Sequence, residues 1–377
     1  MDYTKMSDQI IPVFTPHLAP SAAKNVLACL ESGWISSGGS FVDQFEKAWA
    51  NKCNVRHGIA VNSGTSALEI AVRALELEKG AEVILPSYTI ISCASAILNA
   101  DCTICLVDVN PDTWCLNIEE VAAKISDKTQ AIMPVHMFGH PANMSKIMDL
   151  AKLHDLKVIE DAAEAHGAIV DDKIVGGIGD VGCFSFYANK IVTTGEGGMV
   201  VTDDDVLAER LYSYRNLCFN SERRFLHYKL GHSYRMTNMQ GAIGLSQIDH
   251  LENTIATKRN LAEKYTAALK DVTEISLPIE KNYATSVYWM YGIVLNEQTD
   301  LEANIFASRL RDKGIDTRPF FLGMHEQPVL KQRGLFNGET YPVTEQLARR
   351  GLYLPSGTGL TDEEIDRVCN AVKASLV

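Results

Sequence analysis

The chain has 377 residues, of which 46% are hydrophobic and 22% charged, and its formal net charge is −12. This length allows two domains, and the composition is that of an ordinary globular protein. The acidic balance argues against a nucleic-acid partner, because recognition of a phosphate backbone needs a basic face. No run approaches the roughly 18 apolar residues that a membrane span needs, so we expect no membrane partner.

Nine cysteines lie mostly in apolar surroundings, and the start of the chain lacks the apolar segment of a secretory signal. They predict buried thiols in a reducing compartment, so we expect a cytoplasmic location. Cys102 and Cys105 have the spacing of metal ligands. Because no second pair and no histidine cluster completes a zinc site, we predict that the protein binds no metal.

The first half of the chain alternates helices with strands. Amphipathic periodicity predicts helices at 20–32, 41–51, 66–76, 92–99, 118–125 and 144–154. Short apolar runs predict strands at 57–62, 82–85, 103–109, 131–135 and 157–160. Such repeated βα units predict an α/β protein with a large, mainly parallel sheet covered by helices on both faces.

The second half is less regular. Strands are expected at 181–186, 199–202 and 286–295, and helices at 203–217, 239–255, 260–269, 305–313 and 361–376. The stretch 218–234 has no clear period and is interpreted as an excursion loop. We expect residues 1–255 to form a large domain with an N-terminal segment, and residues 256–377 to form a smaller C-terminal α+β domain.

Residues that could contact a ligand follow two of the expected strands. Ser63-Gly64-Thr65 lies between a strand and a helix, and the free N–H groups at a helix start suit a phosphate. An ordinary Ser/Thr helix cap is the alternative. Tyr88 follows the strand at 82–85, and its ring could stack on a cofactor or could serve packing.

A carboxylate and a lysine follow in the stretch 157–198. Asp161 ends an apolar strand, which is where open α/β sheets place ligands. Lys190 follows an aromatic strand and precedes the glycine-rich loop 195–198. Pyridoxal 5′-phosphate (PLP) needs a lysine amine for its aldehyde and an acidic partner for its pyridine nitrogen. Each feature alone fits a helix cap or a solvated lysine, but their order predicts a PLP site.

Six motifs occur in order: Gly33–Ser37, Asn62–Ala67, Glu160–Glu164, Phe184-Ser185-Phe186 with Lys190, Thr194–Gly198 and Tyr234–Asn238. Together they resemble the DegT/DnrJ/EryC1/StrS family of PLP-dependent sugar aminotransferases, which have the aspartate-aminotransferase fold (PLP fold type I). The resemblance extends from about residue 10 to the end of the chain. Within the family, the stretches 131–136 and 234–238 are most similar to GDP-perosamine synthases.

The resemblance implies roles for residues around the cofactor. Lys190 would hold PLP as a Schiff base and then shuttle the substrate proton, and Asp161 would pair with the pyridinium nitrogen. Glu164 would reach the phenolic oxygen or support the ring, and Tyr88 would stack on it. The phosphate would lie among Ser63, Gly64, Thr65 and Ser185.

The resemblance also implies partners. Asn238 would reach the phosphate from the other subunit, so the active unit would be a homodimer with shared active sites. L-Glutamate would be the amino donor, and a nucleotide-linked 4-keto-6-deoxy sugar the acceptor. Candidate acceptor-binding residues are Trp34, Ser36, Arg318 and His325, each with an alternative as a core or surface residue. His166 departs from the small apolar residue that perosamine synthases commonly have, and its role stays open.

Three alternatives remain. A PLP-dependent sugar dehydratase of the same family carries histidine in place of the Schiff-base lysine, so Lys190 argues against it. An aminotransferase could instead act on a phosphorylated or other keto-sugar. A non-catalytic PLP-fold protein could lose Asp161 or Lys190 without penalty, whereas both are present.

Overall fold

The computed structural model describes residues 10–220 and 222–376. A seven-stranded sheet forms the large domain, in the order β1-β9-β8-β5-β4-β2-β3. Its strands are β1 (His57–Val61), β2 (Glu82–Pro86), β3 (Thr103–Val107), β4 (Thr129–Ile132), β5 (Lys157–Asp161), β8 (Val181–Ser185) and β9 (Gly198–Thr202). Strand β9 runs antiparallel to both neighbours, and the pairs from β8 to β3 are parallel. The mainly parallel sheet expected from the βα alternation is therefore present.

Helices accompany this sheet, close to the predicted positions. They are α1 (Ser21–Ser32), α2 (Ser40–Lys52), α3 (Gly64–Ala74), α4 (Ile91–Asn99), α5 (Ile118–Lys124), α6 (Met144–His154), α7 (Asp205–Arg215) and α8 (Asn238–Ile248). Capping residues set several of their starts. The Ser63 hydroxyl accepts from the amide of Ser66 at α3, and Thr237 and Gln240 form a capping box at α8.

An antiparallel sheet in the order β10-β12-β14-β13 forms the smaller domain. Its strands are β10 (Ile275–Ser276), β12 (Tyr291–Leu295), β13 (Arg318–Pro319) and β14 (Gly351–Leu354). The helices of this part are α10 (Ala303–Asp312), α11 (Pro328–Lys331), α12 (Pro342–Arg350) and α13 (Asp362–Ser375). A small sheet of β6 (Ile169–Val170), β7 (Lys173–Ile174) and β11 (Ala284–Thr285) joins the two parts, and 3-10 turns occupy Met137–Gly139 and Met324–Glu326.

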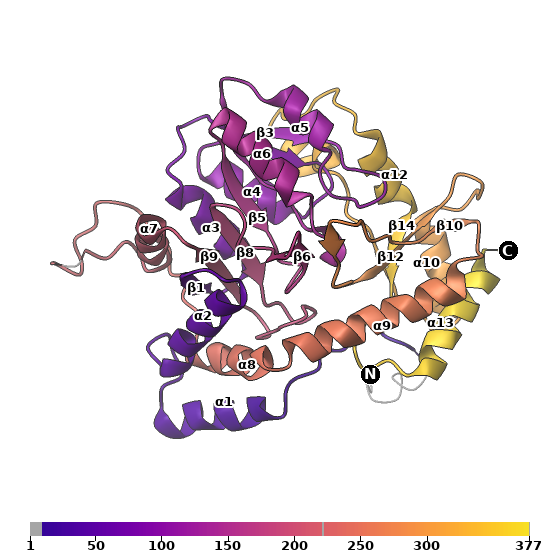
Figure 1. Cartoon of the computed structure of the whole chain (residues 1–377), viewed down its shortest axis with the longest axis horizontal. Helices are drawn as coiled ribbons and strands as arrows, with labels where there is room; N and C mark the ends of the chain where they lie inside the picture. Colours follow the sequence, from indigo (N-terminus) through magenta and orange to yellow (C-terminus); the bar gives the residue numbers. More distant parts are fainter. Residues whose placement is uncertain (1–9, 221, 377) are drawn as a thin grey trace.

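Helix α9 (Leu251–Leu269) is one continuous helix that runs from the large domain to the small domain (Figure 1). The predicted domain boundary after residue 255 falls inside this helix. The first described residues join the small domain, because Ile11 exchanges backbone hydrogen bonds with Gly314 and Asp316. The N-terminal segment therefore packs against the C-terminal part of the chain.

Two elements differ from the sequence-based expectation. The helix expected at 239–255 is two helices, since α8 ends at Ile248 and α9 begins at Leu251. The strand expected at 286–295 is regular only from Tyr291. Tyr288 has a φ of 46°, and the amide of Val287 donates to Gly139 in the large domain. That contact bends the preceding residues out of the sheet.

Candidate active site

Lys190 lies in the turn that follows β8, on the edge where the parallel strands end. Its backbone amide donates to the carbonyl of Tyr187, and its side chain is only 9% exposed. The amine Nζ lies 3.6 Å from the ring centroid of Trp289 and 3.7 Å from Oε1 of Glu164. The second distance is an ion-pair contact, longer than a hydrogen bond.

Asp161 is the last residue of β5, between β4 and β8 in the sheet. Its carboxylate accepts two hydrogen bonds: Oδ1 from the amide of Ala163 at 3.1 Å and Oδ2 from the thiol of Cys93 at 3.0 Å. The thiol also lies 3.3 Å from the hydroxyl of Thr89. These two bonds fix the orientation of the carboxylate.

Burial governs the electrostatics of Lys190 and Glu164. It lowers the pKa of Lys190, while the nearby carboxylates of Glu164 and Asp161 oppose that change. It also raises the pKa of Glu164 to about 7, against the opposing effects of the Lys190 amine and the Phe138 amide. Both groups therefore lose or gain a proton closer to neutral pH than they would in water, as acid–base catalysis requires.

The start of α3 lines a cavity with Gly64 and Thr65. Gly64 and Thr65 are its first two residues, so their amides have no intrahelical acceptor. A Cβ on Gly64 would lie 2.7 Å from Cβ of Ser185, so only glycine allows this close approach. The hydroxyl of Thr65 is 2.8 Å from that of Ser92. The helix start and these hydroxyls suit an anion.

These groups surround one cavity of about 370 Å³. It brings together most of the residues expected around a cofactor, namely Ser63, Gly64, Thr65, Asp161, Glu164, Ser185 and Lys190. A buried amine, a carboxylate and a glycine at a helix start are the groups that a PLP site requires. The residues present therefore fit this cofactor.

Comparison with known proteins agrees with this set of groups. Residues 16–373 match the model of the DegT/DnrJ/EryC1/StrS aminotransferase family. The chain belongs to this family. It is 37% identical to GDP-perosamine synthase of Escherichia coli O157:H7 over 362 residues, covering 96% of this chain and 97% of that protein. It is 39% identical to GDP-perosamine synthase of Caulobacter vibrioides over 368 residues, covering 97% and 98%.

The fold agrees as well. Helicobacter pylori PseC, an aminotransferase involved in the biosynthesis of pseudoaminic acid, superposes with a TM-score of 0.92 at 25% identity, covering 97% of this chain and 99% of that one. As a member of the DegT/DnrJ/EryC1/StrS family, the protein has PLP fold type I and is a PLP-dependent sugar aminotransferase. Within the described residues, no helix is both long and apolar enough to cross a membrane.

Two residues expected at the cofactor do not line the cavity within this chain. Tyr88 is fully buried and does not line the cavity, whereas Ile90 does. The Tyr88 ring packs instead against Phe138 and Phe320. Asn238 is 2% exposed.

The Asn238 side chain is held within its own chain. Its amide nitrogen donates to the carbonyl of Trp34 at 2.7 Å, and its oxygen accepts from the amide of Phe41 at 2.9 Å. Within its own chain this side chain ties α8 to the segment between α1 and α2. The role of Asn238 as a phosphate ligand from a second subunit stays a prediction.

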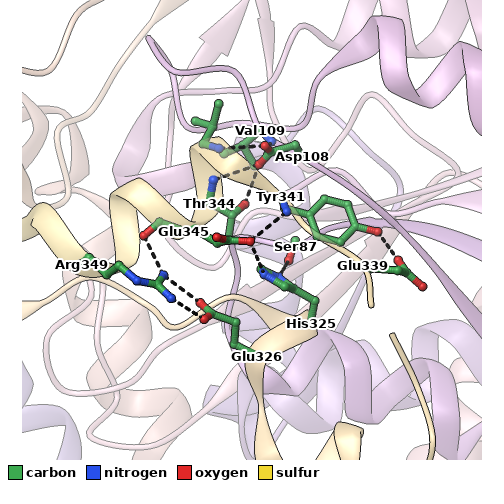
Figure 2. A network of polar contacts seen from close by, with 11 residues as sticks. Ser87, Asp108, Val109, His325, Glu326, Glu339, Tyr341, Thr344, Glu345 and Arg349 are labelled. Carbon is green, nitrogen blue, oxygen red and sulfur yellow. Dashed lines mark hydrogen bonds and ion pairs between the residues drawn. The ribbon is translucent and has the colours of Figure 1, made fainter. Parts of the chain in front are cut away.

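The expected acceptor residues are not gathered at the cavity. Trp34, 61% exposed, and the exposed Ser36 lie beside α8, and Arg318 pairs with Asp316 at 2.8 Å. His325 is 3% exposed and bridges the domains, with Nδ1 2.8 Å from the Ser87 hydroxyl and Nε2 3.2 Å from Glu345 (Figure 2). None of the four lines the cavity within this chain.

His166 is a core residue. Its ring packs against Trp49, Phe184 and Phe186, and Nδ1 accepts a hydrogen bond from the amide of Val192 at 3.2 Å. Burial, followed by the positive charge of Lys190, lowers the pKa of His166 to about 3. A neutral imidazole therefore supports the strand that leads to Lys190.

Other residues of the cavity were not anticipated from the sequence. Trp289, Phe321 and Tyr353 line it from the small domain, and Cys93 holds Asp161 from α4. The sequence signal nearest to Trp289 is the aromatic run 288–291, whose pattern predicts a strand.

Proposed function

We propose that this aminotransferase moves the amino group of L-glutamate to the keto carbon of a nucleotide-linked 4-keto-6-deoxy hexose, with GDP as the nucleotide. The observation that carries the proposal is the pair of buried residues Lys190 and Asp161 in one cavity of a chain that matches perosamine synthases over nearly its full length. A dehydratase or a non-catalytic protein has no need of a buried lysine amine placed beside two carboxylates.

The proposed roles follow from the contacts. Bound PLP supplies an aldehyde that accepts amino groups and a ring that withdraws electrons. The Asp161 carboxylate stabilises a protonated ring nitrogen, because an opposite charge favours the charged form. Lys190 Nζ takes up and returns the substrate proton, and its lowered pKa leaves more of the neutral base that this step needs. Glu164, whose pKa is raised to about 7, can give and take a proton next to that amine. The amides of Gly64 and Thr65, with the hydroxyls of Ser63 and Ser185, bind the phosphate.

We also propose that the active unit is a homodimer in the cytoplasm. Large apolar side chains are exposed along α1 and the loop after it, with Leu27 53%, Leu30 57% and Trp34 61% exposed. A second copy that covers this face would remove them from water. Trp34 and Ser36 could then contact an acceptor only from the neighbouring subunit. The free cysteines fit a reducing compartment.

The test is an incubation of the PLP-loaded protein with L-glutamate and a panel of GDP-, UDP- and dTDP-linked keto-sugars. We expect 2-oxoglutarate release to be sustained by the GDP-linked 4-keto-6-deoxy sugar and to be absent in the Lys190→Ala variant. If 2-oxoglutarate release is sustained only by a phosphorylated or free keto-sugar, the acceptor is that sugar and not a nucleotide-linked one. Equal 2-oxoglutarate release by the Lys190→Ala variant would refute the role of Lys190.

A further inference from the structure

The two walls of the active-site cavity differ in chemistry. The large domain contributes the charged and hydroxyl groups, among them Asp161 and Lys190. The small domain contributes Trp289, Phe321 and Tyr353, which come from three separate segments: the bend before β12, the loop after β13, and β14. Nothing in the proposed roles so far uses this aromatic wall.

The Trp289 side of the wall is firmly held. Its ring nitrogen donates to the carbonyl of Asn189 at 2.7 Å, next to Lys190. Its own carbonyl accepts from the buried amine of Lys258 on α9 at 2.6 Å. These two bonds fix both the ring and the backbone of Trp289, whose ring face is covered by the Lys190 amine at 3.6 Å.

Phe138 supports the other two rings. Phe321 stacks on it at a centroid distance of 6.0 Å and an angle of 27°, and Tyr353 meets it edge-on at 5.7 Å. Tyr353 also pairs with Gly292 in β12 and Arg318 in β13. The wall is therefore preformed, and rings that need no reordering bind a ligand at a lower entropic cost.

The wall carries one polar group. The Tyr353 hydroxyl makes no hydrogen bond to any residue that the structure describes. Burial, together with the nearby Glu164 carboxylate, raises the pKa of Tyr353 to about 12, so the hydroxyl keeps its proton at neutral pH. It is thus available as a donor to an oxygen of a bound molecule.

We propose that Phe321 and Tyr353, next to Trp289, form the subsite for the hexose ring of the acceptor, with C–H faces of the sugar against their rings and a sugar oxygen at the Tyr353 hydroxyl. This inference rests on the proposed function. Pockets for neutral ring ligands combine aromatic walls with few polar groups. Glutamate, with two carboxylates, gains little from these rings, so the wall serves the acceptor and not the amino donor.

The two half-reactions separate this proposal from the proposed function. Stopped-flow absorbance follows cofactor conversion first with L-glutamate alone and then, after its removal, with the GDP-linked 4-keto-6-deoxy sugar. The variants are Phe321→Ala, which removes a ring, and Tyr353→Phe, which removes one oxygen. Tyr283→Ala is the matched control, because this half-buried ring packs on His140 and does not line the cavity.

We expect both wall variants to slow the acceptor half-reaction at low acceptor concentration, by about tenfold for Phe321→Ala, and to leave the glutamate half-reaction unchanged. The control should change neither. Equal slowing of both half-reactions, or no change in either, would overturn the subsite. If Phe321→Ala does not fold, Tyr353→Phe decides alone. Failure of the unmodified protein with glutamate would instead refute the proposed function.

Binding gives a readout apart from turnover. Calorimetry with the Lys190→Ala protein and the GDP-linked keto-sugar should show a dissociation constant that Phe321→Ala raises by about the same tenfold, while binding of GDP alone is unaffected. Equal weakening of GDP and of the GDP-sugar would place the rings at the nucleotide and contradict a sugar subsite.

Discussion

The thiol of Cys93 donates a hydrogen bond to Oδ2 of Asp161 over 3.0 Å in the interior of the protein. The bond links α4 to the carboxyl end of β5, and the same thiol contacts the hydroxyl of Thr89. Burial and the neighbouring carboxylate raise the pKa of the thiol well above its ordinary value, so it remains a donor. Cys93 is thus a positioning residue for the carboxylate that the cofactor needs.

Cys93→Ala should weaken PLP binding. A hydrogen bond to a charged acceptor contributes roughly 1.5 kcal/mol, so the dissociation constant should rise by about tenfold. Cys93→Ser keeps a donor and should restore most of the affinity. Cys183→Ala is the control, because it removes another buried thiol close to Asp161: Cys183 lies on β8, opposite Asp161 of β5. Absorbance titration of the cofactor-free proteins measures the constants, and equal losses in both alanine variants would contradict the positioning role.

Asp161→Ala should abolish transamination while leaving the fold intact. Without a carboxylate, a protonated ring nitrogen loses its opposite charge, and kcat/KM should fall by at least about 10²-fold. Steady-state kinetics give this ratio, and circular dichroism checks the fold. Turnover close to that of the unmodified enzyme would remove Asp161 from the mechanism.

The amine of Lys190 should titrate below an ordinary lysine in the cofactor-free protein, because burial lowers its pKa. The Glu164 carboxylate opposes this shift by favouring the charged amine. Glu164→Gln should therefore move the midpoint of Lys190 acetylation to still lower pH. Mass spectrometry of the acetylated peptides gives the midpoint, with the half-exposed Lys157 as internal reference. A midpoint that rises in Glu164→Gln would reverse the proposed coupling.

Lys258 should make stability depend on pH. It is 1% exposed, and burial lowers its pKa to about 7. Between about pH 7 and 10.5 the unfolded chain binds the proton and the folded chain does not, so stability rises with pH across this window. Relative to Lys258→Met, the unmodified protein should gain about 1.4 kcal/mol per pH unit. Urea unfolding at successive pH values measures the difference, and a constant difference would exclude this titration.

The sequence predicted the cofactor side of the site because that side depends on local order. A strand that ends in Asp161 and a strand that leads to Lys190 lie in one parallel sheet, so their carboxyl ends share an edge. The glycine and hydroxyl residues at 63–65 were found for the same reason.

The acceptor side could not be predicted in this way. Three aromatic residues line the cavity from the small domain, which α9 connects to the large domain: Trp289, Phe321 and Tyr353. Their positions along the chain do not indicate that they lie at the cavity. After β2 ends, Tyr88 is fully buried, whereas Ile90 is 44% exposed and lines the cavity. Nothing in the sequence indicates that Gly39 packs against the amide group of Asn238.

The central claim is that Lys190 is the residue that binds the PLP aldehyde. Borohydride reduction of the PLP-treated protein, followed by peptide mass spectrometry, tests it most directly. The account predicts one pyridoxyl group, on Lys190, and its loss in Lys190→Ala. A pyridoxyl group on another lysine, or unchanged labelling of the Lys190→Ala variant, would contradict it.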